Sequence, residues 1–136
     1  MAQYDVTCSC GHDEHVTLYG KHAEREARMA AMAKRPCIAC RAKAAREAGI
    51  SKGSDKQVAW ALEIRETLIK DAKAAVEWAA GTDEYANLDP SGKERADKRF
   101  AAIVSWYEGL DDAKTIIDLR GAHGKWTILA YDEYNG

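Results

Sequence analysis

Apolar and polar residues alternate in two short runs near the start of the chain, residues 4–7 and 16–19. Alternation with a period of two is typical of a β-strand that buries one face. The segment between the two runs contains the small and polar residues that favour a turn. The pattern therefore predicts a β-hairpin at the N-terminal end of the protein.

After the hairpin, the pattern changes to one that favours helices. Residues 22–34 and 41–48 are rich in Ala, Glu, Arg and Met or Lys, which are strong helix formers. Pro36 follows the first of these helices, and Gly49 ends the second. Residues 49–53 are bounded by two glycines and form the clearest break in the chain, so we expect a junction there.

A long helix is predicted after this junction. Ser54 and Gln57 have the spacing of a capping box, in which each side chain satisfies a free backbone N–H at the start of a helix. Apolar residues recur at helical spacing up to about Ala80, and Gly81 is suited to end the helix. The apolar stripe comprises Val58, Ala61, Leu62, Leu68, Ile69, Ala72 and Val76.

Two further helices are predicted in the second half of the chain. Residues 82–90 form a polar connection, and a second capping-box pattern at Ser91 and Glu94 opens the first of the two helices. Asp111 or Asp112 is expected to cap the second, which is shorter.

The last apolar run, residues 126–131, predicts one strand. Because a lone strand needs a partner, we expect it to pair with the N-terminal hairpin. The expected fold class is α+β, with a small module of hairpin and helix in residues 1–50 and a helical body with one C-terminal strand in residues 51–136. Because a module of this size buries little surface on its own, we expect it to pack on the body as one structural unit.

The four cysteines of the chain lie in two close pairs, Cys8 with Cys10 and Cys37 with Cys40. Two clips of soft ligands, separated by a loop that holds a strand and a helix, match the ligand pattern of a structural zinc ion. We therefore expect the N-terminal module to be a zinc ribbon, with all four thiolates as the favoured ligands.

Two histidines leave the ligand set open. His12 and His15 lie close to the first cysteine pair, and either could replace Cys8 or Cys10. A complete four-thiolate site has no open coordination position, so its zinc ion contributes folding energy and no Lewis-acid chemistry. A histidine ligand weakens that argument without removing it.

The composition fits a soluble globular protein: of 136 residues, 46% are hydrophobic and 31% are charged. No apolar run approaches the ~20 residues needed to span a bilayer, and the first residues lack the basic and apolar regions of a signal peptide. We therefore expect a cytoplasmic protein with no membrane partner. Thiols stay reduced in that compartment, which favours a metal over disulfides.

The cysteine frame and two later segments resemble the proteins of one family. The order Cys-x-Cys-Gly, a strand, an Arg-bearing helix and Cys-x-x-Cys resembles the zinc-ribbon-like domain of small, largely uncharacterised bacterial and phage proteins. Residues 53–61 look like their GSxKQxAWA segment, and residues 112–120 look like their DAKxxID-R segment. The resemblance implies zinc binding at Cys8, Cys10, Cys37 and Cys40, and it brings no established activity.

Positive charge is concentrated near the second cysteine pair. Residues 1–56 contain ten Lys and Arg against seven Asp and Glu, whereas residues 57–136 contain ten against fifteen. A basic patch can neutralise phosphates, but a solvated helix face is the favoured interpretation because the rest of the chain is acidic, and no aromatic residue is interleaved for base stacking. Candidate contacts to a partner or to nucleic acid are Arg41, Lys43, Arg46, Lys52, Lys56 and Trp60.

No triad of nucleophile, base and acid is apparent in the sequence, and the paired carboxylates have no histidine beside them. The favoured function is a non-enzymatic, zinc-stabilised interaction protein. If it has the phage or mobile-element origin that the resemblance implies, we expect it to dock on, or occlude, a host machine for defence or nucleic-acid metabolism. The first alternative is a DNA- or RNA-binding regulator that uses the basic zinc module, and a remoter one is an enzyme with an unrecognised site.

Overall fold

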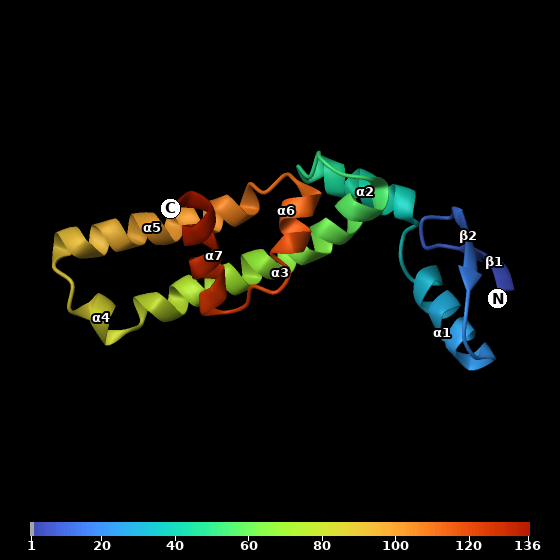
Figure 1. Ribbon diagram of the computed structural model, residues 1–136, viewed down its shortest axis with the longest axis horizontal. Helices are drawn as coiled ribbons and strands as arrows, with labels where there is room; N and C mark the ends of the chain where they lie inside the picture. The colour runs from blue at the N-terminus through green and yellow to red at the C-terminus, as the bar shows by residue number, and fades with distance from the viewer. Residues whose placement is uncertain (1) are drawn as a thin grey trace.

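The computed structural model describes residues 2–136 as an elongated, mostly helical molecule with a two-stranded hairpin at one end (Figure 1). Its elements are β1 (Ala2–Thr7), β2 (Asp13–Leu18), α1 (His22–Ala33), α2 (Ile38–Glu47), α3 (Asp55–Ala80), α4 (Asp83–Ala86), α5 (Pro90–Glu108), α6 (Ala113–Asp118) and α7 (Lys125–Asn135). This content confirms the α+β class. No helix in the described part of the chain is both long and apolar enough to cross a membrane.

The predicted N-terminal hairpin is confirmed. Strands β1 and β2 pair antiparallel, with Tyr4 opposite Val16 and Val6 opposite Glu14. Val6 and Leu18 are buried, and α1 lies against β1. Helix α1 itself has no buried residue, so this hairpin–helix unit, residues 2–33, has only a thin apolar layer.

Helix α3 is the central element of the helical body, residues 38–135. Helices α2, α5, α6 and α7 all pack on it (Figure 1). Its start is the predicted capping box: the Gln57 N–H donates to Ser54 Oγ (3.3 Å), and the Ser54 N–H donates to Gln57 Oε1 (2.9 Å). The buried core comprises Ala42, Ala45, Ile50, Val58, Ala61, Leu68, Ala72, Ile103, Tyr107, Leu110, Ala113, Ile116 and Leu119.

The prediction of a C-terminal strand is wrong. Residues 126–131 lie in helix α7, and the only sheet among the described residues is β1–β2, at the other end of the molecule. Helical spacing lets Ile128 and Tyr131 pack on the core of the body. Thr127 is fully buried, and the Tyr107 hydroxyl donates to its carbonyl oxygen at 2.6 Å. Tertiary packing therefore decides the conformation of this segment.

The second predicted capping box is also wrong. The N-cap of α5 is Asp89, whose carboxylate accepts the Gly92 N–H at 2.6 Å, and Pro90 occupies the first helical position. The polar connection before it contains the short helix α4, which was not predicted. Asp112 caps α6, as one of the two predicted alternatives.

The junction between α2 and α3 is attached to the turn before α6. The Ser51 N–H donates to Asp111 O (3.0 Å), and the Ala113 N–H donates to Lys52 O (2.9 Å). Beneath it, the buried Arg65 guanidinium donates to Ala48 O (2.7 Å) and to Leu110 O (2.9 Å). These bonds fix the end of α2 on the body.

Candidate metal centre

Four potential metal ligands meet where the hairpin turn approaches the start of α2. Cys10 and His12 lie in the turn between β1 and β2. Cys37 is the residue before α2, and Cys40 lies in the first turn of that helix. The ligand atoms of these four residues all lie within 4.8 Å of one another. Cys37 is buried, Cys10 and Cys40 are half-buried, and His12 is exposed. This group could hold a metal ion.

The turn between the strands brings Cys10 and His12 to the same place. Gly11 has a φ of +85°, a conformation that residues with a Cβ rarely adopt. The Cys8 N–H donates to His12 O (2.9 Å), and the Gly11 N–H donates to Cys8 O (2.9 Å). The tight turn therefore positions two ligands only two residues apart.

Backbone hydrogen bonds join the turn to α2. The Cys37 N–H donates to Cys10 Sγ (3.3 Å), and the Ser9 N–H donates to Arg35 O (3.0 Å). The Glu14 carboxylate accepts the N–H of Ile38 at the start of α2. The two clips are thus held together by contacts that do not themselves need a metal.

The thiols of the cluster differ in acidity. Hydrogen bonds from the backbone of Cys37 and His12 lower the pKa of Cys10 to about 6. Side-chain hydrogen bonds with Cys37 and Cys10 raise the pKa of the Cys40 thiol to about 11. Cys10 therefore loses its proton more readily than Cys40, and the thiolate is the form that binds a metal. Binding at Cys40 must release a proton.

Cys8 lies outside the cluster. Its side chain is buried at the base of the turn, with Sγ 3.8 Å from Val6 O, and burial raises the pKa of its thiol. His15 lies on the outer face of the hairpin, where Nδ1 is 2.7 Å from an Asp5 carboxylate oxygen. The structure thus brings together three of the four predicted cysteines and one of the two histidines considered as replacements, His12.

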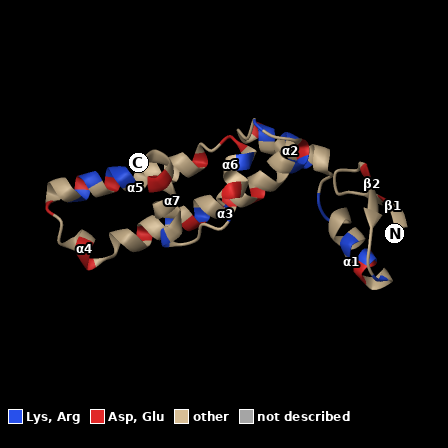
Figure 2. Cartoon of the chain, viewed as in Figure 1, with Lys and Arg blue, Asp and Glu red and all other residues tan. Residues whose placement is uncertain are grey.

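Two cations of the predicted basic patch form ion pairs with acidic residues of the protein itself. Arg46 pairs with Asp55 (3.1 Å) and donates to the carbonyl oxygens of the junction, and Lys52 Nζ lies 4.0 Å from the Asp111 carboxylate. Figure 2 shows charges of both signs along α1, α2, α3 and α5. Arg46 and Lys52 therefore already have partners within the protein.

The other candidate cations are more open. Arg41 Nε donates to Pro36 O (3.1 Å), and both Arg41 and Lys56 line a hollow beside Glu14 and His15. Lys43 is exposed, and its side chain forms no ion pair or hydrogen bond within residues 2–136. Arg41 and Lys56 thus share their hollow with the carboxylate of Glu14.

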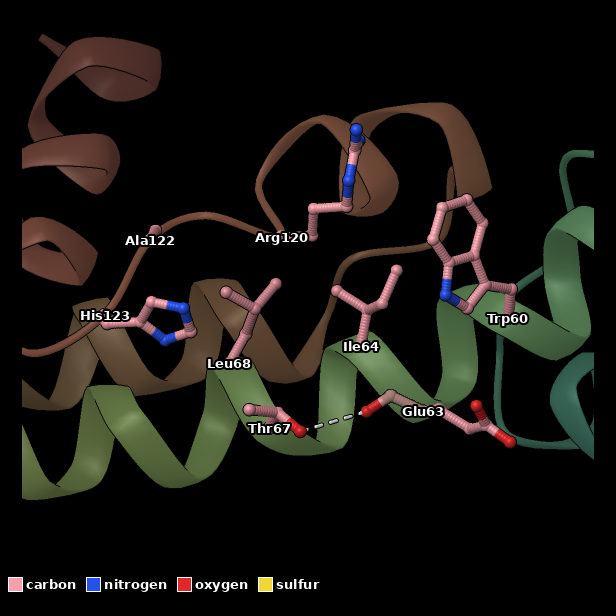
Figure 3. Close-up of a pocket in the computed structure, with 8 residues that line it drawn as sticks. All are labelled: Trp60, Glu63, Ile64, Thr67, Leu68, Arg120, Ala122 and His123. Carbon is pink, nitrogen blue, oxygen red and sulfur yellow. Dashed lines mark hydrogen bonds between the residues drawn. The ribbon is translucent and has the colours of Figure 1, made fainter.

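Trp60 borders a separate hollow of about 250 Å³, the Trp60 groove (Figure 3). Its floor is formed by Ile64 and Leu68 of α3, and Arg120 and His123 line it from the segment between α6 and α7. Sequence reasoning identified Trp60 and missed Arg120 and His123. Those two residues lie some sixty positions away, and no motif connects them to Trp60.

Comparison of the chain with protein-family models, with curated proteins and with solved structures found no match in any of the three. The geometry described above is therefore the basis for assigning a function.

Proposed function

We propose that this protein is a non-enzymatic interaction protein whose N-terminal module is stabilised by one structural zinc ion, and that it docks on a protein partner. The ligands of the ion are Cys10, His12, Cys37 and Cys40. The observation that carries the proposal is the cluster of their four ligand atoms within 4.8 Å of one another.

The spacing of the cluster supports zinc. Tetrahedral zinc with Zn–S of about 2.3 Å and Zn–N of about 2.0 Å separates a sulfur from a nitrogen ligand by about 3.5 Å. His12 Nδ1 lies 3.3 Å from Cys40 Sγ and 3.7 Å from Cys37 Sγ. Three thiolates and one imidazole are also a common ligand set of structural zinc sites.

The completeness of the ligand set supports a role without catalysis. Four protein ligands fill a tetrahedral zinc site and leave no position for water or substrate. Zinc bound there would supply folding energy by joining the hairpin turn to α2. The function then lies on the surfaces that this joint holds in place.

The charge pairs near α2 support a protein partner over a nucleic acid. Arg46 and Lys52, which were candidate phosphate contacts, are paired with Asp55 and Asp111. Carboxylates beside cations repel a phosphate backbone, so they disfavour the salt-dependent binding that nucleic acids require. We propose that the partner is a component of a host machine, which this protein occludes by docking.

Metal analysis of single variants tests the ligand set. We expect about one zinc ion per purified chain, as one four-donor site requires. His12→Ala and Cys37→Ser should lose the ion, while the matched controls His15→Ala and Cys8→Ser should retain it. Loss of zinc from Cys8→Ser, with retention in His12→Ala, would show that the four thiolates form the site instead.

Photo-crosslinking tests the class of partner. A benzoyl-phenylalanine introduced at exposed positions of the full-length protein in its native cells should give discrete protein–protein adducts. Fluorescence anisotropy with DNA and RNA at low salt should show no binding that falls steeply with added salt. Adducts to nucleic acid alone, together with such salt-dependent binding, would replace this function by the nucleic-acid alternative.

A further inference from the structure

We infer that the Trp60 groove receives one large apolar side chain of the protein partner, and that Arg120 pairs with an acidic residue beside that side chain. The inference rests on the proposed interaction function and names the surface and the chemistry of the partner. It is carried by the arrangement of Trp60, Ile64, Leu68, Arg120 and His123 around one hollow (Figure 3).

The floor of the groove is apolar and only partly covered by the chain itself. Trp60, Ile64 and Leu68 follow one another at four-residue spacing along α3, so they lie along one side of the helix. Leu68 is buried and Ile64 is half-buried, but Trp60 is 47% exposed. An exposed tryptophan beside an open apolar hollow is a typical anchor point of a protein interface.

Arg120 supplies a cation without an acidic partner. Its guanidinium carbon lies 5.6 Å from the centre of the Trp60 ring, and its Nη1 donates to Ile117 O at 2.8 Å. Arg120 forms no ion pair within residues 2–136. The cation–π contact with Trp60 and the bond to Ile117 O position the guanidinium, and its remaining N–H groups can donate to a carboxylate.

His123 closes the other end of the groove. Its Nδ1 lies 3.0 Å from the Asp71 carboxylate, which orients the ring beside Leu68 (Figure 3). His123 Nε2 forms no hydrogen bond or ion pair with another described residue. The groove is thereby bounded along α3 by Trp60 at one end and by an oriented imidazole at the other.

Size and charge favour a protein side chain as the occupant. The hollow of about 250 Å³ is smaller than the ~300–1,000 Å³ typical of small-molecule sites, and it suits a single anchoring side chain. The carboxylate of Glu63, at the margin opposite Arg120, disfavours the run of phosphates that a nucleic acid would bring (Figure 3). The unpaired Arg120 is the complementary charge for an acidic residue of the partner.

A random peptide library displayed on phage and selected on the intact, zinc-loaded protein tests the inference. The expected result is enrichment of peptides in which Leu, Met, Phe or Trp lies next to Asp or Glu. Trp60→Ala should weaken binding of a selected peptide at least about tenfold, as removal of a central anchor does. Arg120→Glu should abolish peptide binding. Arg120→Lys should retain part of the binding, because lysine keeps the positive charge but lacks the planar guanidinium with its paired donors.

Trp126→Ala is the matched control, because Trp126 is 57% exposed on α7 and lies outside the groove. This variant should bind the selected peptides as the parent does. Failure to enrich this motif, or equal binding by Trp60→Ala and the parent, would overturn the inference. Discrete protein adducts at positions distant from the groove would in that case leave the proposed interaction function standing, so the two failures are distinguishable.

Discussion

The hairpin–helix unit and the helical body are stabilised in different ways. The unit buries two apolar strand residues, Val6 and Leu18, and α1 buries none. The body has a continuous core that runs from Ala42 on α2 to Leu119 after α6. A unit of about thirty residues cannot bury enough apolar surface to offset its loss of chain entropy, so it needs another source of folding free energy.

The candidate metal site lies where these two differently stabilised regions meet. The cluster lies at the boundary of the two regions, with two ligands in the hairpin turn and two at the start of α2. α2 is already held on the body through Ala42, Ala45 and the bond from Arg65 to Ala48. Backbone hydrogen bonds already join the turn to α2, and a metal ion bound in the cluster would strengthen this joint, so we expect the hairpin to be less firmly held without the ion.

Removal of the metal gives the largest expected effect. Structural zinc sites contribute apparent binding free energies of about 10–16 kcal/mol at neutral pH, so a chelator should unfold the hairpin–helix unit. The body should remain folded, because its core contains no residue of that unit. Hydrogen exchange should show loss of protection in β1 and β2 with protection retained in α3.

Tryptophan fluorescence provides the internal control for this experiment. All four tryptophans, Trp60, Trp78, Trp106 and Trp126, belong to the body, so their emission should hardly change when the metal is removed. A large change in emission on chelation would contradict the independence of the two regions.

Truncation of the body core should have the next largest effect. Ile103 is completely buried, and Ile103→Ala should lower the free energy of unfolding of the body by about 2–5 kcal/mol. Met29 on α1 is only half-buried, so Met29→Ala should leave the tryptophan-detected transition in urea unchanged. A shift of that transition by Met29→Ala would show that the two regions unfold together.

Replacement of Arg65 tests how the end of α2 is held on the helical body. Arg65→Met removes the donors to Ala48 O and Leu110 O, which should cost about 1–3 kcal/mol and loosen the end of α2. Arg65→Lys keeps the charge and should retain part of this stability. Urea unfolding measures the loss, and faster exchange of the Ile50 amide would locate it. An effect on the hairpin amides alone would contradict this role.

Replacement of Tyr107 should have the smallest effect and depends on pH. Burial raises the pKa of Tyr107 from its ordinary 10.0 to about 12, so the folded state favours the neutral phenol. Its contribution is complete below pH 10 and is lost as pH rises towards 12. Tyr107→Phe should cost about 1 kcal/mol at pH 7, through the lost bond to Thr127 O.

The Phe variant should therefore lose less stability than the parent between pH 10 and 12, in urea titrations at several pH values. A parallel loss of stability in both proteins across that range would show that Tyr107 does not titrate there.

Local sequence patterns predicted the elements whose ends are determined locally. The hairpin follows from alternation, and the start of α3 follows from Ser54 and Gln57, since a capping box involves residues only three positions apart. The two cysteine pairs can be recognised because the two residues of each pair lie close together in the sequence. In each case the signal lies within a short stretch of the chain.

Tertiary contacts decided the elements that the sequence analysis missed. Residues 126–131 have the composition of a strand, yet the body buries Thr127 and packs Ile128 and Tyr131 on its core, which requires the spacing of a helix. The fourth member of the cluster was decided in the same way. His12 reaches Cys37 and Cys40 because the turn places it there, whereas the same turn buries Cys8 against the backbone of Val6.

The sequence by itself therefore determined that this protein has a hairpin and a long capped helix, and it identified two pairs of cysteines as candidate metal ligands, since each of these signals depends on neighbouring residues. Only the tertiary structure decided which residues surround the candidate metal site and that Arg120 and His123 join Trp60 around one groove. Those groupings depend on packing between segments twenty-five or more residues apart, for which a local pattern carries no signal.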